Sequence, residues 1–240
     1  MLYRIVHLSI RILSRFLCRL VVTGREHIPE QGPFLITLNH LSSVDPILIY
    51  GQMPVRLRMA GLAAMSHRYD WFIGRWMDYG GAIWVRRGET DRQALRHALD
   101  ALAAGRPLGL APEGTRSKTG ALIEGKKGTA FLAIRSGVSI LPSVMYGTEK
   151  VLPNLRRLHR MTISMTFAPA FSLPPRGDGP RSEHVQYCTD LIMARLASML
   201  PEAYRGVYTG HPLIAYWEQL DAEGCAAHPE WKREIVLDAD

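Results

Sequence analysis

The residues best suited to chemistry lie between an apolar run that ends at Asn39 and a second apolar run that follows Pro46. This change of pattern is typical of a turn between a buried strand and a helix. Pro46 suits the first turn of a helix, which predicts Asp45 as the N-cap. If the turn folds back, the Asp45 carboxylate accepts a hydrogen bond from one ring nitrogen of His40, and the other nitrogen can take a proton from a substrate hydroxyl. The alternative is a helix cap beside a solvated imidazole.

Two further loops carry residues that suit a phosphate group. Arg86 and Arg87 follow one short apolar run, and the segment PEGTRS at 112–117 follows another. A guanidinium is always charged and binds phosphate through two parallel hydrogen bonds, and backbone N–H groups near Gly114 can add donors. The chain has no GxSxG, Walker A or GxGxxG motif. The pattern therefore predicts a phosphate site beside a general base.

The elements that must position these loops alternate between short apolar runs and helical patterns. This alternation predicts a single-domain α/β fold with a central, largely parallel sheet flanked by helices and with functional loops at the carboxyl ends of the strands. A length of 240 residues suits one domain. The predicted strands are 33–38, 55–61, 81–85, 107–111, 138–145 and, at an edge of the sheet, 161–167. The predicted helices are 46–51, 70–79, 90–104, 127–136 and 182–200.

Residues 2–21 are long enough to cross a bilayer as a helix, but Arg4, Arg11, Arg15 and Arg19 place too many charges in them for a span. On a helix these arginines form one stripe, and apolar residues cover much of the remaining surface. The pattern favours an amphipathic helix that lies in the membrane plane, with its arginines toward anionic headgroups. A helix that packs on the protein core fits equally well. A signal peptide is disfavoured because arginines interrupt the apolar region and no cleavage site follows.

Two segments are less informative. The aromatic residues Trp71, Phe72 and Trp76 in the segment 70–79 suit the core or a membrane interface equally well. Residues 206–240 show no clear periodicity, and we assign no element to them.

The composition points to an anionic partner. The formal net charge is +7, and the first 25 residues carry five arginines and no acid. Nucleic acid is disfavoured because the basic residues lack interleaved aromatic residues and a recognition-helix pattern. The three cysteines are widely spaced, which predicts a reducing compartment without a disulfide framework, and no ligand spacing suggests a metal.

Four segments occur in the order seen in glycerolipid acyltransferases. They are NHLSSVD at 39–45, GAIWVRR at 81–87, PEGTRS at 112–117 and VSILP at 138–142. Over residues 20–150 the chain resembles the 1-acyl-sn-glycerol-3-phosphate acyltransferases, which acylate lysophosphatidate. The HxxxxD and PEGTRS motifs are more specific together than either is alone. Two positions depart from the family pattern, because Arg86 stands where Asp is frequent and Ser139 stands where Pro is frequent.

The resemblance implies a role for each motif residue. His40 would be the general base and Asp45 its orienting partner, and the residues that bind the acceptor and its phosphate would be Arg87, Glu113, Gly114, Thr115 and Arg116. The implied reaction needs no metal or cofactor. It moves an acyl chain from acyl-CoA or acyl carrier protein to a lysophospholipid, most directly 1-acylglycerol-3-phosphate, to give phosphatidate.

The resemblance also implies a peripheral protein at the cytoplasmic face of the cell membrane, where it would meet an anionic surface and no nucleic acid. The chain would divide into a membrane-anchoring helix at 1–22, an acyltransferase domain at 23–205 and a tail at 206–240. Two alternatives stay open at this stage. One is an acyltransferase for another acceptor, such as glycerol-3-phosphate or another lyso-lipid, and the other is a basic peripheral membrane protein without catalysis.

Overall fold

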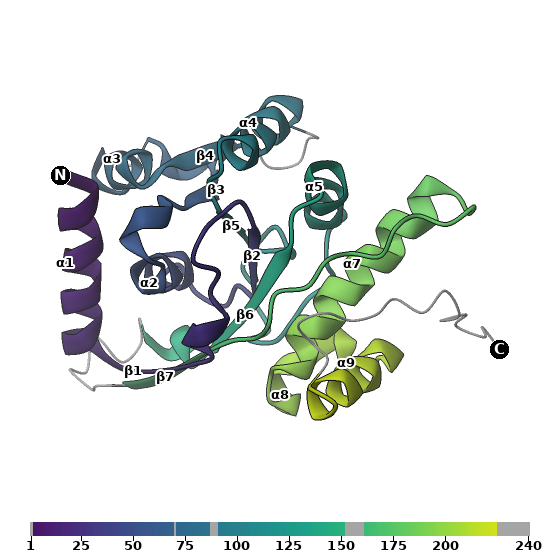
Figure 1. Ribbon diagram of the computed structural model, residues 1–240. Helices are drawn as coiled ribbons and strands as arrows, with labels where there is room; N and C mark the ends of the chain where they lie inside the picture. Colours follow the sequence, from purple (N-terminus) through teal and green to yellow (C-terminus); the bar gives the residue numbers. More distant parts are fainter. Residues whose placement is uncertain (1, 70, 87–90, 152–160, 225–240) are drawn as a thin grey trace.

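One seven-stranded sheet organises the computed structural model, which describes residues 2–69, 71–86, 91–151 and 161–224 (Figure 1). The strand order is β1-β7-β6-β2-β5-β3-β4, and every neighbouring pair is parallel except β6 and β7. This confirms the predicted α/β fold with a largely parallel sheet. The strands are Cys18–Thr23 (β1), Leu35–Leu38 (β2), Ala60–Ala64 (β3), Ala82–Val85 (β4), Leu108–Leu110 (β5), Ile140–Tyr146 (β6) and Met161–Phe167 (β7).

Helices cover both faces of the sheet, as Figure 1 shows. One buried cluster joins α1 and α2 to β1, β2, β6 and β7, and the other joins α4, α5, α7 and α9 to β2, β5 and β6. The α-helices are Leu2–Leu17 (α1), Asp45–Gln52 (α2), Trp71–Gly80 (α3), Arg92–Ala103 (α4), Gly128–Ser136 (α5), Arg181–Ser198 (α7), Glu202–Arg205 (α8) and Pro212–Ala222 (α9).

Strand β2 lies at the centre of the sheet and determines where the functional loops meet. All four of its residues are buried, as expected for an apolar strand with both faces covered. It pairs in parallel with β6 on one side and with β5 on the other, with Leu35 opposite Leu108. Because β2 and β5 are parallel neighbours, the loops that follow them leave the same edge of the sheet side by side.

The amino-terminal helix is shorter than predicted, and β7 is not an edge strand. Helix α1 ends at Leu17, and the next six residues form β1 instead of the last turns of the helix. Strand β1 pairs in parallel with β7 from Cys18 opposite Met161 to Thr23 opposite Thr166, so β7 is an inner strand. Burial alternates along most of β1, a strand pattern that is hard to see because it continues an apolar helix. No helix in the described ranges is long and apolar enough to cross a bilayer.

One other predicted strand was partly wrong. The segment 55–61 begins with a short 3-10 helix at Val55–Leu57, and Arg58 then adopts a φ of +46° before β3 begins at Ala60. The side chains of Trp71, Phe72 and Trp76 lie outside the described part of the structure, so their predicted alternatives stay open.

The carboxyl-terminal segment, to which the sequence assigned no element, contains a helix that belongs to the core. Trp217 on α9 is fully buried, and its indole N–H donates to the Leu191 carbonyl of α7 at 3.1 Å. The buried Arg195 guanidinium stacks 4.9 Å from the Trp217 ring and forms a two-bond ion pair with Asp221 at 2.6 and 2.8 Å. Helix α9 thus covers the outer side of α7 and closes the second cluster.

Candidate active site

The His–Asp pair predicted from the sequence is formed in the loop after β2. Nδ1 of His40 lies 3.0 Å from Oδ2 of Asp45. The backbone N–H groups of Leu41 and Ser42 donate to the same oxygen at 2.7 and 2.6 Å. The Asp45 side chain is buried, whereas 16% of the His40 side chain is exposed. A carboxyl oxygen that is held by two backbone N–H groups and lies against Nδ1 fixes the ring orientation of His40 and leaves Nε2 for a substrate.

Asp45 does not cap helix α2, contrary to the prediction. It is the first residue of the helix, Val44 occupies the N-cap position, and no side chain caps the helix. The carboxylate turns back toward the preceding loop, because two free N–H groups and an imidazole are available there.

Glu113 ties the loop after β5 to the backbone of His40. Its Oε1 accepts the His40 N–H at 2.8 Å, its Oε2 accepts the Ile123 N–H at 3.1 Å, and the Ser117 N–H donates to the His40 carbonyl at 2.8 Å. Both backbone polar groups of His40 are therefore held by the segment 113–117. Burial raises the pKa of Glu113 from its usual value of 4.5 to about 7, although the two N–H donors act in the opposite direction.

We expect Glu113→Gln to remove a pH dependence of folding stability. Because the pKa is higher in the folded state, the contribution of Glu113 to stability should be complete below about pH 4.5, and about 3 kcal/mol should be lost as the pH rises from there through about 7. Glutamine cannot ionise, so the variant should lack this loss. Urea unfolding from pH 4.5 to 8 measures the difference, with the exposed Glu124→Gln as control. Parallel stability curves for the wild type and Glu113→Gln would contradict the expectation.

The predicted phosphate ligands differ in how far the structure brings them toward His40. Arg116 reaches the His40 loop, where its guanidinium donates to Oγ of Ser43 at 2.8 Å. Thr115 is half-buried in the same turn. Gly114 has a φ of +67°, and its N–H donates to the Ala111 carbonyl at 3.0 Å, so this N–H is not a free donor for phosphate. Arg87 lies outside the described residues.

Lys126 is a cation beside this loop that we did not single out from the sequence. Its N–H donates to the Pro112 carbonyl at 2.8 Å, and its side chain crosses the open face of Gly114. A Cβ atom at position 114 would lie 3.0 Å from Cδ of Lys126. The only sequence signal was the pair Lys126-Lys127 after a glycine, which does not show that the chain folds back onto the loop.

A cavity of about 160 Å³ opens beside His40 on the face of the sheet covered by α1 and α2. His40 and Tyr50 are the ionisable side chains among the residues that line it. Its walls come from α1, α2, α3, β3 and β5 and include Val6, Ile10, Ile49, Met59, Met77 and Leu110. A cavity that is lined mostly by apolar side chains and that also touches His40 suits a hydrocarbon chain with a reactive group at one end.

Comparisons with known proteins identify the family of the chain. The family model described as Acyltransferase matches residues 19–146, more than half of the chain, and the chain therefore belongs to the acyltransferase family. The 1-acyl-sn-glycerol-3-phosphate acyltransferase of Borreliella burgdorferi is 31% identical over 133 residues, which are 55% of this chain and 52% of that protein. The chloroplastic LPAT1 of Arabidopsis thaliana, also named a 1-acyl-sn-glycerol-3-phosphate acyltransferase, is 29% identical over 55% of this chain and 37% of its own.

A solved structure extends the similarity beyond the matched family segment. The crystal structure of PlsC, the 1-acyl-sn-glycerophosphate acyltransferase of Thermotoga maritima, matches with a TM-score of 0.60 and 25% identity. The match covers 79% of this chain and 78% of that one. The chain matches only about half of the length of the first curated relatives. The resemblance inferred from the motifs is confirmed at the level of the family.

Proposed function

We propose that the protein transfers an acyl chain from a thioester donor to the hydroxyl of 1-acylglycerol-3-phosphate and so forms phosphatidate. The observation that carries the proposal is the His40–Asp45 pair, 3.0 Å apart, whose histidine lines a mostly apolar cavity and whose loop contacts Arg116. The curated relatives are named for this reaction. The chain supplies a base, a place for a hydrocarbon chain and cations for a phosphate.

The mechanism follows from the arrangement of these groups. Nε2 of His40 takes the proton of the acceptor hydroxyl as its oxygen attacks the thioester carbonyl. Asp45 stabilises the imidazolium that forms, because its ionised oxygen already accepts the hydrogen bond from Nδ1. When the tetrahedral intermediate collapses, the C–S bond breaks and the imidazolium returns the proton to the thiolate. No covalent acyl-enzyme and no metal step is needed, because a thioester is already reactive toward an alkoxide.

The acceptor phosphate would lie between Arg116 and Lys126, in front of the loop at 112–117. The Arg116 guanidinium contacts the His40 loop through its hydrogen bond to Ser43, and the Lys126 side chain lies over Gly114. A phosphate held there brings the glycerol hydroxyl toward His40. Glu113, whose oxygens are both engaged by backbone N–H groups, positions His40 and does not bind the substrate in this proposal.

Arg116→Ala is expected to raise the KM for lysophosphatidate by about tenfold, because one charge-assisted pair to the phosphate is lost. The kcat should change much less, since the dyad is untouched. Initial rates over a range of acceptor concentrations measure both values, with the exposed Arg135→Ala as the control. An unchanged KM would place the phosphate elsewhere.

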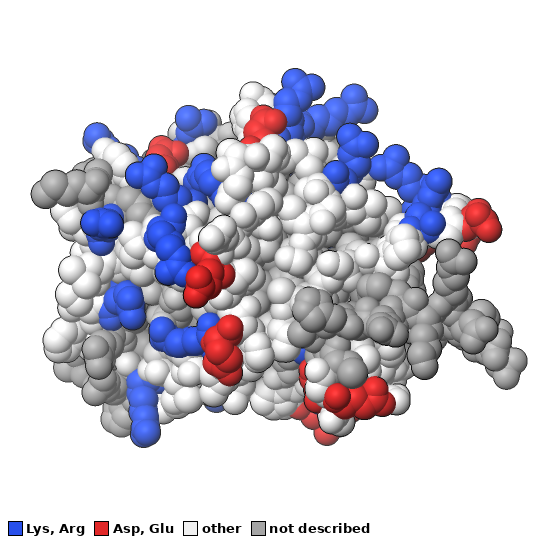
Figure 2. Space-filling view, in the orientation of Figure 1, with Lys and Arg blue, Asp and Glu red and all other residues white. Residues whose placement is uncertain are grey.

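Helix α1 would hold this site at a membrane surface. One of its sides packs on α2 through Val6 and Ile10, while its outer side exposes Leu8 (58%), Phe16 (76%) and other apolar side chains. The core-packing interpretation thus describes the inner side of this helix, and membrane contact by the outer side is the proposal made here. Figure 2 shows Lys and Arg over the part of the molecule where α1 lies in Figure 1, with few acids among them. Exposed apolar side chains flanked by cations suit an anionic bilayer surface, which we propose to be the cytoplasmic face of the membrane.

The double variant Leu8→Ser, Phe16→Ser is expected to bind anionic vesicles at least about tenfold more weakly than the wild type, because it removes two large apolar side chains from the interface. Substitution is preferable to deletion of residues 1–21, which would remove part of β1 from the sheet. Co-sedimentation with vesicles measures binding, and Val207→Ser, which alters an equally exposed apolar residue far along the chain, is the control. Undiminished binding by the double variant would show that α1 does not make the membrane contact.

The experiment that tests the proposed function is acyl transfer from a labelled acyl-CoA or acyl carrier protein to lysophosphatidate in vesicles. Labelled phosphatidate formed by the wild type would support it. A parallel reaction with glycerol-3-phosphate and with other lyso-lipids tests the alternative acceptors. If product forms from one of these acceptors and not from lysophosphatidate, that acceptor replaces lysophosphatidate in the proposal. If no pair of substrates gives product, the proposal is overturned.

A further inference from the structure

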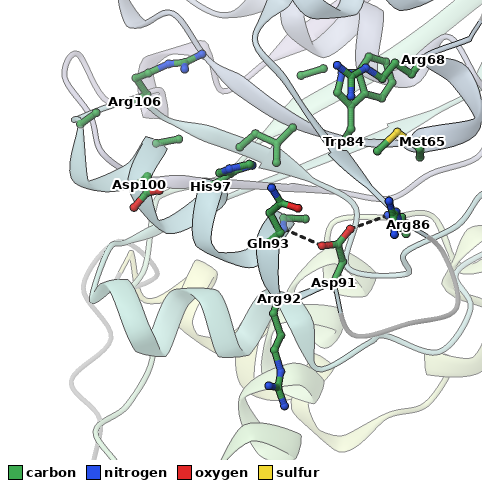
Figure 3. Close-up of a pocket in the computed structure, with 15 residues that line it drawn as sticks. Met65, Arg68, Trp84, Arg86, Asp91, Arg92, Gln93, His97, Asp100 and Arg106 are labelled. Carbon is green, nitrogen blue, oxygen red and sulfur yellow. Dashed lines mark hydrogen bonds between the residues drawn. The ribbon is translucent and has the colours of Figure 1, made fainter.

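A second and larger cavity, of about 680 Å³, lies between the edge strand β4 and helix α4 (Figure 3). Its lining residues come from β4, from α4 and from the segment after β3. None of them belongs to the loops that hold His40 or Arg116. The proposed mechanism gives this cavity no role.

Three guanidinium groups border this cavity without a carboxylate partner. They belong to Arg68, Arg86 and Arg106, and no ion pair within 4.0 Å involves them among the described residues. Figure 3 shows Arg68 and Arg86 toward one end of the cavity and Arg106 toward the other, while Arg92 points away. Cations at both ends suit a ligand with phosphate groups at two separate positions.

The acids beside the cavity offset only part of this positive charge, and Asp91 has its pKa lowered mainly by the N–H groups of Arg86 and Ala94 and in smaller part by the Arg86 charge. The Asp91 carboxylate accepts hydrogen bonds from the Arg86 N–H at 3.0 Å and from the Ala94 N–H at 2.9 Å. Asp91 is therefore the N-cap of α4. Asp100 lies on α4 near His97 (Figure 3). A carboxylate in this position can accept a hydrogen bond from a ribose hydroxyl.

Trp84 adds an aromatic surface whose orientation is fixed. It lines the cavity, and its indole N–H donates to Oδ1 of Asp78 on α3 at 2.7 Å. A ring held in this way can stack on a purine base without losing further freedom of its own. The volume falls within the range of about 300 to 1,000 Å³ that is usual for small-molecule sites.

The cavity is also placed where a long donor molecule could reach it from the dyad. His40 follows β2, and β5 and β3 separate β2 from β4 in the sheet. Three strand spacings of about 4.8 Å give a lateral distance of about 14 Å. Arg68 and Arg86 follow the carboxyl ends of β3 and β4, which lie on the same edge of the sheet as His40.

We propose that this cavity binds the 3′-phosphorylated adenosine diphosphate portion of a coenzyme A thioester. The inference rests on the proposed acyl transfer. The diphosphate lies against Arg68 and Arg86, the 3′-phosphate lies toward Arg106, and Trp84 stacks on the adenine. The flexible pantetheine arm then crosses the carboxyl ends of β3 and β5 and brings the thioester to His40. The donor is thus a nucleotide thioester and not a carrier protein.

The test uses adenosine 3′,5′-bisphosphate, a probe that carries no acyl chain and needs no turnover. Its binding to the full-length wild type is measured by calorimetry beside Arg68→Gln, Arg86→Gln and Trp84→Leu. Arg96→Gln is the matched control, because Arg96 is exposed on the same helix α4 and does not line the cavity. The proposal expects each cavity variant to weaken binding by about tenfold or more and the control to stay within about twofold. Circular dichroism confirms that each variant is folded.

Two results would overturn the proposal. One is absence of binding, or equal binding by the wild type and all variants. The other is a KM increase for an acyl-carrier-protein donor in Arg68→Gln and Arg86→Gln without an increase for acyl-CoA, which would make the cavity part of a protein-docking surface. Nucleotide binding that depends on these residues, in a protein that acylates no acceptor, would uphold the nucleotide site and refute only the acyl-transfer function.

Discussion

His40→Ala is expected to lower the turnover of acyl transfer by about 10² to 10⁴-fold, the usual contribution of a positioned general base. The loss follows from the loop after β2, where Nδ1 of His40 lies 3.0 Å from Oδ2 of Asp45 and Nε2 is left to take the proton of the acceptor hydroxyl. The KM values for donor and acceptor should change much less than the turnover, because the other residues that line the cavity and Arg116 are unaltered. Phosphatidate formation from labelled donor gives the rate.

The control for this variant is His67→Ala, which replaces an exposed histidine away from the dyad. Thermal unfolding should show that both variants keep the fold, since the backbone groups of His40 that Glu113 and Ser117 hold are present in alanine as well. Near-normal turnover by His40→Ala would refute its role as the base.

Asp45→Asn is expected to lower kcat by about 10²-fold. The amide oxygen can still accept from the backbone of Leu41 and Ser42, so the loop should keep its shape. It carries no charge, however, and stabilises the imidazolium less in the transition state. A second effect concerns Oδ1, a buried atom without a hydrogen-bond partner among the described residues. The amide nitrogen would take its place, and a buried N–H donor without an acceptor lowers stability.

The separation of kcat from KM identifies Asp45 as a positioning and charge-stabilising residue. Both KM values should stay within about twofold of the wild type, because Asp45 is buried and does not touch the cavity. Asp178→Asn, an exposed substitution in the loop before α7, is the control. An Asp45→Asn enzyme with normal kcat would mean that His40 needs no carboxylate.

The sequence predicted the parts of this fold that local patterns determine. Short apolar runs bounded by glycine and proline predicted most of the strands, and the helical spacing of apolar residues over 90–104 predicted α4. Strand β1 was missed because its partner, β7, lies more than a hundred residues away, and nothing local shows that pairing. The role of Trp217 was missed for the same reason, since its burial depends on α7.

In the site, too, contacts between residues close in sequence were predicted, and contacts between distant segments were not. The spacing from His40 to Asp45 is a local pattern, and the contact that it predicts is formed. Glu113 was read as a substrate ligand because its motif suggested it, but its oxygens are directed to the N–H groups of His40 and Ile123. Lys126 and the two cavities depend on how separate elements pack, and no spacing along the chain contains that information.

Helix α1 contributes Val6 and Ile10 to the wall of the apolar cavity, while its opposite side exposes Leu8 and Phe16. A single layer of helix therefore separates the proposed bilayer contact from the proposed acyl-chain site. A hydrocarbon chain that moves round this helix passes from the bilayer to the apolar cavity without contact with water. It therefore avoids the cost of hydration, which is about 0.8 kcal/mol for each methylene group. The activation barrier for substrate entry would then depend little on chain length, and discrimination between chains would depend on the size of the cavity.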